Sequence, residues 1–417
     1  MGKAVAVIGA GIVGLCCARV LQRAGHAVTV FDPQPPARGA SFGNAGHIAI
    51  DHIRPLARPD ILAQVPRMLL DPLGPLAIRW RDAPRLLPWL ARFALAARPA
   101  QVARGTAALS ALLGAASGAW AEELRGSNLA GLFRAKGALV VYATDAAFAA
   151  AARERDILAR HGVALETMEG AKARVLAPGL MPGIRHATFF PGASHTVDPY
   201  GLALGLAEAF RRDGGRIKEA AVTGGESDGQ RVLALATTRG RFAADAFVLA
   251  AGLASRELGP LFGLALPLAA ERGYHLMVEA PEARFEVPVT WAERGFVMTP
   301  MEAAGIRLAG TVELASAAAP PSWERAELLL RHARTLFPAL GGREVSRWMG
   351  LRPTFPDYLP AIGQAPRRRN LFIACGHQHI GLTAAAITGR IIGALVAGAA
   401  PPVDLGAFRP DRFGGTR

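Results

Sequence analysis

Three glycines near the start of the chain have the spacing of a phosphate-binding turn. Gly9, Gly11 and Gly14 follow the apolar run Ala4–Ile8 as G-x-G-x-x-G, and Asp32 stands 18 residues after the last of them. In this pattern the glycines allow a tight turn, close approach of the backbone to a pyrophosphate, and packing of a helix on a strand. The helix N-terminus favours the negative charge, and the acidic residue accepts hydrogen bonds from ribose hydroxyls. The sequence therefore predicts a dinucleotide site.

Three later segments have the small residues that a bulky, planar cofactor would need beside it. They are residues 40–46, rich in Ala, Ser and Gly; Ala250–Gly252, after the apolar run 246–250; and Gly376–Thr383, at the start of an apolar helix. Loops at the carboxyl ends of parallel strands are where ligands bind in open α/β sheets. For the first segment, a flexible connection is the alternative interpretation.

The elements that must position these loops follow an interrupted α/β pattern. Strand Ala4–Ile8, helix Ile12–Ala24 and strand Ala27–Phe31 are followed by mixed structure, and α/β patterns return twice before the end of the chain. We expect a strand pair with a Pro-Gly turn over Ala187–Val197. We also expect helices over 50–135, with breaks at Pro66, Pro72, Pro75, Pro84, Pro88 and Pro99. The predicted fold is α/β, with a Rossmann-like cofactor domain (1–85, 196–264, 346–417) and a mixed α+β substrate domain on an antiparallel-rich sheet (86–195, 265–345).

Composition limits the possible partners and the compartment. The 417 residues are 51% hydrophobic and 19% charged, and the formal charge of +14 comes mainly from scattered arginines, which favours no nucleic-acid partner. Three cysteines form no disulfide framework, and no metal-ligand pattern appears. Without a signal peptide or a membrane-spanning run, we expect a cytoplasmic protein. The Arg-rich helix 85–98 either lies on the cytoplasmic face of a membrane or packs on the core.

The motifs together resemble the FAD-dependent D-amino-acid oxidase/dehydrogenase superfamily over essentially the whole chain. They are GAGIVG with Asp32, SFGNAG at 41–46, AAG at 250–252, GLRPTFPDYLPAIG at 350–363 and GHQHIGLT at 376–383. SFGNAGHI and ERGYHLMV (Glu271–Val278) are most similar to bacterial D-amino acid dehydrogenases and D-hydroxyproline dehydrogenases. Relatives that tether the flavin have a cysteine in the stretch matching Gly350–Pro356. None occurs here, so the resemblance implies non-covalent FAD.

The resemblance also implies which residues contact FAD. The ADP half is assigned to the N-terminal glycine turn, the end of the second strand, Val222 and the AAG segment, and the flavin half to the other loops. The cofactor-binding residues expected are Gly9, Ala10, Gly11, Ile12, Val13, Gly14, Asp32, Pro33, Gln34, Ser41, Asn44, Ala45, Gly46, Val222, Ala250, Ala251, Gly252, Gly376, His377, Gln378, His379, Ile380, Gly381, Leu382 and Thr383.

Four residues are expected to act on the substrate. Arg352 matches the arginine that holds the substrate carboxylate, for which a planar, two-pronged guanidinium is suited; a buried structural ion pair is the alternative. His47, Tyr274 and His379 are the further catalytic candidates, with packed or surface positions as their alternatives. Alternation along a strand places Tyr274 and His275 on opposite faces, so at most one of them faces the substrate.

The resemblance implies oxidation of a D-amino or imino acid. One form of this prediction is a substrate of the D-proline or hydroxyproline type. Hydride passes from Cα to flavin N5, and the imine is hydrolysed to a 2-oxo acid or stays cyclic. No general base is needed if the amine enters deprotonated. A quinone or respiratory acceptor is expected, with a membrane or a partner subunit as its setting. The alternatives are a glycine/sarcosine-type oxidase, an electron-transfer subunit and a nicotinamide-dependent dehydrogenase.

Overall fold

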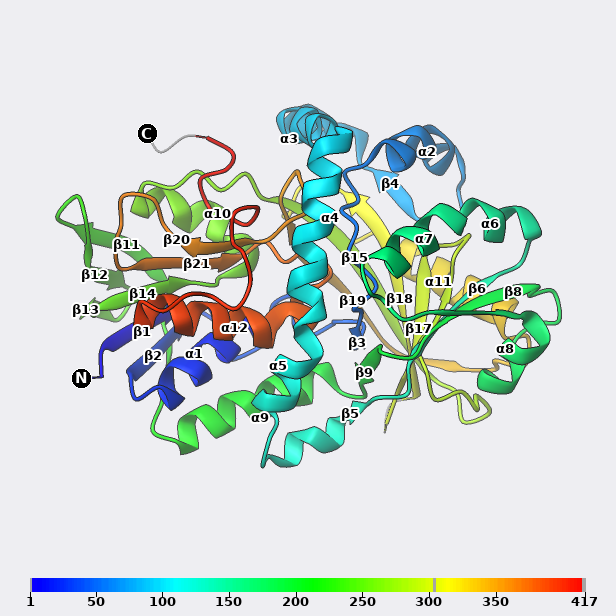
Figure 1. The fold of residues 1–417 in the computed structure, drawn as a ribbon, viewed down its shortest axis with the longest axis horizontal. Helices are drawn as coiled ribbons and strands as arrows, with labels where there is room; N and C mark the ends of the chain where they lie inside the picture. The colour runs from blue at the N-terminus through cyan, green and yellow to red at the C-terminus, as the bar shows by residue number, and fades with distance from the viewer. Residues whose placement is uncertain (1, 303–304, 415–417) are drawn as a thin grey trace.

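A six-stranded sheet carries the N-terminal motif in the computed structural model, which describes residues 2–302 and 305–414 (Figure 1). Its neighbouring strands are parallel, except β20, which runs antiparallel to β21. In spatial order the strands are β10 (Arg216–Glu219), β2 (Ala27–Asp32), β1 (Ala4–Ile8), β14 (Ala246–Leu249), β21 (Leu371–Cys375) and β20 (Ala361–Gln364). The central strands are apolar and buried, as expected where both faces of a sheet are covered.

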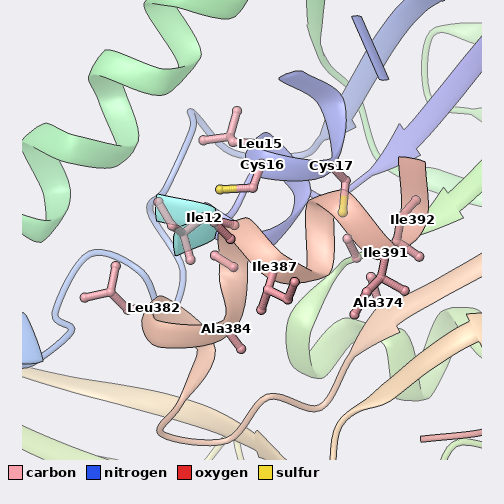
Figure 2. Close-up of a cluster of buried hydrophobic side chains, with 14 of the residues drawn as sticks. Ile12, Leu15, Cys16, Cys17, Ala374, Leu382, Ala384, Ile387, Ile391 and Ile392 are labelled. Atoms are coloured by element: carbon pink, nitrogen blue, oxygen red, sulfur yellow. The ribbon is translucent and has the colours of Figure 1, made fainter. Parts of the chain in front are cut away.

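Helix α1 (Ile12–Arg23) packs along α12 (Gly381–Ala397) beside this sheet, with α9 (Pro199–Arg212) on its other flank. Figure 2 shows the apolar contact between α1 and α12, including both cysteines of α1. A Cβ atom at Gly389 would lie 2.8 Å from the carbonyl oxygen of Cys16, so a glycine is needed for this close approach. Cys16 and Cys17 are free and fully buried, which confirms that they act as small core residues.

The second half of the structure is built on a nine-stranded sheet whose pairs are mainly antiparallel. Helix α11 (Glu324–Leu336) packs on β15 and β18. The strands are, in spatial order, β19 (Arg343–Thr354), β15 (Ala269–Glu279), β18 (Gly305–Leu314), β17 (Phe296–Met301), β16 (Val289–Trp291), β6 (Ala138–Tyr142), β8 (His186–Phe190) and β7 (Glu166–Glu169), with β4 (Leu76–Ile78) beside β18. The expected α/β fold with a second, antiparallel-rich half is confirmed.

Two strands lie on the other side of the predicted domain boundaries. β4 falls within 1–85 but pairs with β18, and residues 346–354 belong to β19, which follows β15 along its whole length. In both cases, the hydrogen bonds to a strand distant in sequence decide to which sheet the segment belongs. The division into two domains stays a prediction.

Two three-stranded sheets complete the β structure. β3 (His47–Ile48), β9 (Ser194–Thr196) and β5 (Phe133–Arg134) form one, and β11 (Val222–Ser227), β12 (Val232–Thr237) and β13 (Gly240–Ala243) the other. The strand pair predicted over Ala187–Val197 is wrong. β8 pairs with β6 and β7, whereas β9 pairs with β3 and β5, so the Pro-Gly turn passes from one sheet to another.

The helical region is continuous across two prolines that were expected to break it. Pro66 lies inside α2 and Pro88 inside α3. Both helices are largely exposed, so water can satisfy the carbonyl that each proline leaves unpaired. The helices not yet given are α2 (Pro59–Leu70), α3 (Ala83–Ala96), α4 (Pro99–Gly114), α5 (Ala116–Glu123), α6 (Asp145–Ala150), α7 (Ala152–Arg160), α8 (Gly170–Leu176) and α10 (Ser255–Leu258). Within the described ranges, none of the helices has the length and apolar character needed to cross a bilayer.

Candidate active site

The predicted cofactor loops meet at one edge of the six-stranded sheet. β2, β1, β14 and β21 are neighbours, and the loops with Asp32, Gly9–Gly14, Ala250–Gly252 and Gly376–Thr383 follow their carboxyl ends. Val222 follows three residues after Glu219, which is the register partner of Asp32 across β10 and β2. Segments from the two ends of the chain thus come together at the edge where α/β sheets bind ligands.

The glycine turn has the shape that a pyrophosphate needs. Gly9 has φ of 112°, and a Cβ atom there would overlap the carbonyl group of Ala250. At Gly14 a Cβ atom would overlap the carbonyl oxygen of Gly9. Above Gly11 the nearest atom is the Ser41 hydroxyl oxygen at 3.4 Å, so this side of the turn is open. The tight turn at Gly9 and the close packing at Gly14 are thus as the spacing predicts, and the pyrophosphate contact of Gly11 stays a prediction.

Asp32 is fixed at the end of β2 by backbone hydrogen bonds. Its Oδ2 accepts from the amide of Ala10 at 2.8 Å, and its Oδ1 accepts from the amide of Gln34 at 2.9 Å. A carboxylate has about four acceptor positions, so two remain for ribose hydroxyls. Nearby, the Ser41 hydroxyl accepts from the amide of Ile12 at 3.0 Å, at the start of α1. The residues present fit the ADP half of a dinucleotide.

The 376–383 segment is held in place by side chains that point inward. His377 Nε2 lies 3.0 Å from Thr388 Oγ1 inside the protein, so only its backbone is left for a cofactor. The Thr383 hydroxyl accepts from the amide of Ala49 at 3.1 Å and joins α12 to the chain after β3. Gln378 is held at φ of 42°. This turn is rigid and has backbone groups near a helix start, as a flavin ring requires.

Arg352 lies on the adjoining face of the large sheet. Across β15 and β19, Glu271 pairs with Arg352, Gly273 with Gly350, and His275 with Trp348. Directly opposite residues of a sheet share a face, so these side chains form one wall. His275 stacks on Trp348 with 5.3 Å between ring centres, and its Nδ1 lies 3.0 Å from the carbonyl oxygen of Gly43. The wall thus contacts the 41–46 loop.

The Arg352 guanidinium forms no ion pair within the described chain. Its Nη1 donates to the carbonyl oxygen of Thr311 at 3.1 Å. A Cβ atom at position 273 would overlap the guanidinium, so Arg352 lies directly over Gly273. Burial lowers the pKa of Arg352, and the negative charge of Glu271 opposes this shift. Glu271 accepts a hydrogen bond from the Tyr358 hydroxyl, and burial raises its pKa. The structural ion pair that was the alternative for Arg352 is therefore not formed.

Tyr274 does not reach this wall. Its hydroxyl donates to Glu313 Oε2 at 2.5 Å and accepts from the amide of Ser322 at 2.9 Å. The ring packs in the core between the sheet and α11. As strand alternation predicts, one residue of the Tyr274–His275 pair faces the site, and it is His275. The catalytic role expected for Tyr274 is not supported, because the side chain lies on the opposite face of β15.

A row of histidines lies beside the predicted flavin loops. The ring centres of His379 and His52 are 5.1 Å apart, and those of His52 and His47 are 6.0 Å apart. Burial lowers the pKa of His47 to about 4 and that of His379 well below its usual range; the charge of Arg352 contributes to the latter shift. Both of these predicted residues are therefore neutral imidazoles near the site.

Several residues of this region were not among the sequence candidates. They are His52, Glu271, Gly273, Trp348, Tyr358 and Arg307, the last of which donates to the carbonyl oxygen of Asn44. Side chains alternate along a strand, so Gly273 and Glu271 lie on the same face as His275. The sequence can identify them as site residues only if it is already known that this face points to the site. The register with β19 that determines this face joins residues about 80 positions apart.

A glycine-rich turn at the carboxyl edge of a parallel sheet, beside a part-buried arginine without an ion pair in the described chain, is typical of dinucleotide-dependent oxidoreductases. The family model described as "FAD dependent oxidoreductase" (DAO) matches residues 4–395, and the chain belongs to this family. FAD is therefore the cofactor, and the nicotinamide-dependent alternative is wrong.

Individual relatives cover almost the whole chain. It is 36% identical over 423 residues to a D-amino-acid oxidase of Bradyrhizobium diazoefficiens, with 99% of each chain covered. It is 33% identical to a D-amino acid dehydrogenase of Paramagnetospirillum magneticum, with 98% of each covered. Among solved structures, glycine oxidase from Geobacillus kaustophilus has a TM-score of 0.75 at 26% identity, with 99% of each covered. L-proline dehydrogenase from P. horikoshii, with a TM-score of 0.76 at 18% identity over 99% and 98%, shares the fold.

Proposed function

We propose that this protein oxidises D-amino acids, with the substrate carboxylate bound by Arg352. The observation that carries this proposal is a part-buried guanidinium without an ion pair in the described chain, lying over Gly273 next to the predicted flavin loops. A cation that is partly removed from water is unfavourable unless its N–H groups find acceptors, and the Glu271 carboxylate opposite it forms no ion pair with it in the described chain. A bound carboxylate provides a counter-charge and accepts two parallel hydrogen bonds from the guanidinium.

In this proposal the chain's own residues orient the substrate and exclude water. Arg352 fixes the carboxylate, and the stacked His275 and Trp348 limit where the Cα substituents can lie. FAD, when bound, supplies the acceptor for the two electrons lost with the Cα–H bond. Fixed geometry of this kind lowers the barrier by removing rotational freedom before the reaction. The residues proposed to hold FAD are those at the carboxyl edge of the six-stranded sheet, without a covalent bond to the chain.

The names of the relatives support a D-amino acid more strongly than a cyclic imino acid. The two sequence relatives described above are a D-amino-acid oxidase and a D-amino acid dehydrogenase, and the glycine oxidase is a structure above 25% identity. The L-proline dehydrogenase is only 18% identical and supports the fold alone. We therefore place D-proline and hydroxyproline as members of a test panel and not as the expected substrates.

The test is anaerobic reduction of the bound FAD, followed by its absorbance. The panel contains D-alanine, other neutral D-amino acids, D-proline, cis-4-hydroxy-D-proline, glycine and sarcosine, with the L-enantiomers as controls. We expect bleaching by D-amino acids and none by L-amino acids. Reduction by glycine or sarcosine alone would favour the glycine/sarcosine-type alternative. A flavin that no member bleaches would contradict the proposal and favour an electron-transfer subunit.

We further propose that a quinone in an anionic membrane accepts the electrons. Segment 67–98 exposes Leu70, Leu73, Trp80, Leu87 and Leu95 together with Arg67, Arg81, Arg85, Arg92 and Arg98; we call this the apolar–basic surface. Its acidic residues are already paired. Asp71 contacts Arg294, and Asp82 accepts from the amide of Ser316. A surface of exposed apolar side chains and free cations fits anionic lipid headgroups.

The underside of α3 connects this surface with the site. Trp89 donates from Nε1 to the carbonyl oxygen of Thr354 at 3.1 Å, two residues after Arg352. Phe93 contacts Tyr358 with 5.8 Å between ring centres. Helix α3 thus contacts the chain next to Arg352 with one face and carries part of the apolar–basic surface on the other.

The membrane proposal is tested by co-sedimentation of the full-length holoenzyme with vesicles. We expect binding to vesicles that contain phosphatidylglycerol and much weaker binding to phosphatidylcholine alone. Leu87→Ser combined with Trp80→Ser, at side chains 61% and 70% exposed, is expected to weaken binding at least tenfold. The matched control is Val175→Ser, 77% exposed on α8. Equal binding by all three proteins would contradict the proposed surface.

A further inference from the structure

The proton of the substrate ammonium group has no obvious acceptor at Arg352. An amino acid carries a protonated amine at neutral pH, and loss of hydride from Cα requires the nitrogen lone pair. Glu271 is close, but it already accepts a hydrogen bond from Tyr358, and burial raises its pKa, which favours the protonated carboxyl that has no room for a further proton. Groups that can take up a proton and pass it on lie between this pocket and solvent.

His379 is joined to the Arg352 end of β19 by the backbone. Gln378 N donates to the carbonyl oxygen of Pro353 at 3.1 Å, and His377 bridges to Thr354. These contacts place the residues 377–379 turn against residues 353–354. His379 is a neutral imidazole there, and a neutral ring holds one nitrogen as donor and the other as acceptor. It is therefore suited to pass a proton and not to keep it.

His52 continues the row from His379 to solvent. Their ring centres are 5.1 Å apart in an edge-on arrangement, a separation that one water molecule or a small ring rotation bridges. The His52 side chain is 42% exposed, so a proton that arrives there can leave to bulk water. On its other side the neutral His47 ring is 6.0 Å away and adds no positive charge above pH 5.

Asp51 supplies the counter-charge for a protonated His52. Its Oδ2 lies 3.8 Å from His52 Nε2, and the side chain is only 9% exposed. Asp51 Oδ1 is buried and has no hydrogen-bond partner in the described chain. A buried carboxylate with an unpaired oxygen is costly unless a cation is nearby. The groups that face His52 are thus Asp51, His47 and His379, with Arg352 beyond the last.

We propose that His379 and His52 form a two-imidazole relay that carries the substrate's ammonium proton to solvent, with Asp51 stabilising the charged His52 ring. In this step an N–H bond of the ammonium breaks and its electron pair stays on nitrogen. His379 binds the proton on one ring nitrogen and releases the proton of the other to His52, which gives it to water. The substrate is neither oxidised nor reduced in this step. The inference rests on the proposed D-amino acid substrate.

The first test is the pH dependence of anaerobic FAD reduction by the best D-amino acid of the panel. Wild type is expected to slow on the acid side, as the relay becomes protonated. His52→Gln is expected to reduce FAD about 100-fold more slowly at pH 7, within the range of general acid–base catalysis, and to lose that acid limb. His52→Ala is expected to regain most of the rate when imidazole is added. His161→Gln, an exposed histidine after α7, is the matched control and is expected to behave as wild type.

The second test does not depend on turnover. In the holoenzyme, NMR titration of the His52 ring is compared between wild type and Asp51→Asn. The midpoint is expected to move to lower pH in the variant, because the charged ring loses its counter-charge. An unmoved midpoint, or a His52→Gln rate and pH profile within twofold of wild type, would overturn the relay. If no D-amino acid reduces the wild-type flavin, the proposed function fails instead, while the NMR titration still decides on the Asp51–His52 pair.

Discussion

The guanidinium of Arg352 occupies the space above Gly273, where any other side chain would begin. Arg352 is on β19, the edge strand of the large sheet, and Gly273 is on the neighbouring β15; a Cβ atom at 273 would overlap Cζ and Nη2 of the arginine. Because Gly273 on β15 has no side chain, the guanidinium of Arg352 on β19 can lie directly over it. A substrate-binding group and the glycine beneath it form a single unit.

Gly273→Ala tests this unit. The added methyl group is expected to displace the guanidinium and raise KM for a D-amino acid at least tenfold, while FAD stays bound because the cofactor loops are on the other sheet. Steady-state kinetics and the flavin spectrum measure the two effects. Gly118→Ala, with no atom within 4 Å of the new Cβ, is the control and is expected to leave both unchanged. A Gly273→Ala enzyme with wild-type KM would show that Arg352 does not need this position.

Tyr274→Phe separates a structural from a catalytic role. Removal of the hydroxyl leaves Glu313 and the amide of Ser322 without this partner, which is expected to lower the free energy of unfolding by about 1–3 kcal/mol. The rate constant of FAD reduction is expected to stay within twofold. Tyr142→Phe, whose hydroxyl makes no hydrogen bond in the described chain, is the control for stability. A large loss of rate with normal stability would restore the catalytic role that the sequence suggested.

Stability is expected to fall as the pH drops from 6.5 to 4. Burial lowers the pKa of His47 and of His195 to about 4, whereas the unfolded chain protonates histidine near 6.5. Between these values the unfolded state binds more protons, so acid favours unfolding. Urea unfolding at several pH values measures the slope. His195→Gln is expected to reduce the slope by up to about 1.4 kcal/mol per pH unit.

The exposed His161 again supplies the comparison for that experiment. Its replacement by glutamine is expected to leave the pH slope unchanged, because the side chain is exposed to solvent. A slope that is the same in His195→Gln and wild type would mean that the buried histidines do not drive the acid sensitivity.

Local patterns in the sequence predicted the nucleotide half of the site. The run from Ala4 to Asp32 encodes strand, turn, helix and strand within 30 residues, and Gly9 and Gly14 have the roles that their spacing gives them. The buried cysteines follow from the same apolar periodicity. Such features depend on neighbours in sequence, so no knowledge of the tertiary fold was needed.

The substrate side could be predicted only in part, because its geometry depends on pairing between distant strands. Alternation correctly separates Tyr274 from His275, but it does not say which one faces inward. The β15–β19 register decides this, and it joins Tyr274 to Met349. Likewise, β9 leaves its sequence neighbour β8 for β3, so the Pro-Gly turn at 191–192 gave the wrong pairing.

Prolines were the other source of error. Pro66 and Pro88 were expected to end helices, yet α2 and α3 continue through them. Helix propensity gives the free-energy cost of a proline in a helix, but it does not say whether tertiary contacts of that helix offset this cost. On α3, Trp89 and Phe93 anchor the helix on Thr354 and Tyr358, which supplies part of that offset.

The carboxylate-binding role of Arg352 is tested most directly by ligand binding to the holoenzyme without turnover. Propanoate and D-lactate are titrated anaerobically into wild type, Arg352→Ala and Arg352→Lys, with perturbation of the flavin absorbance as the readout. We expect Kd to rise by about 100-fold in Arg352→Ala and by less in Arg352→Lys, with FAD retained in all three. An unchanged Kd in Arg352→Ala, in a protein that keeps its flavin, would contradict the proposal that this guanidinium binds the substrate.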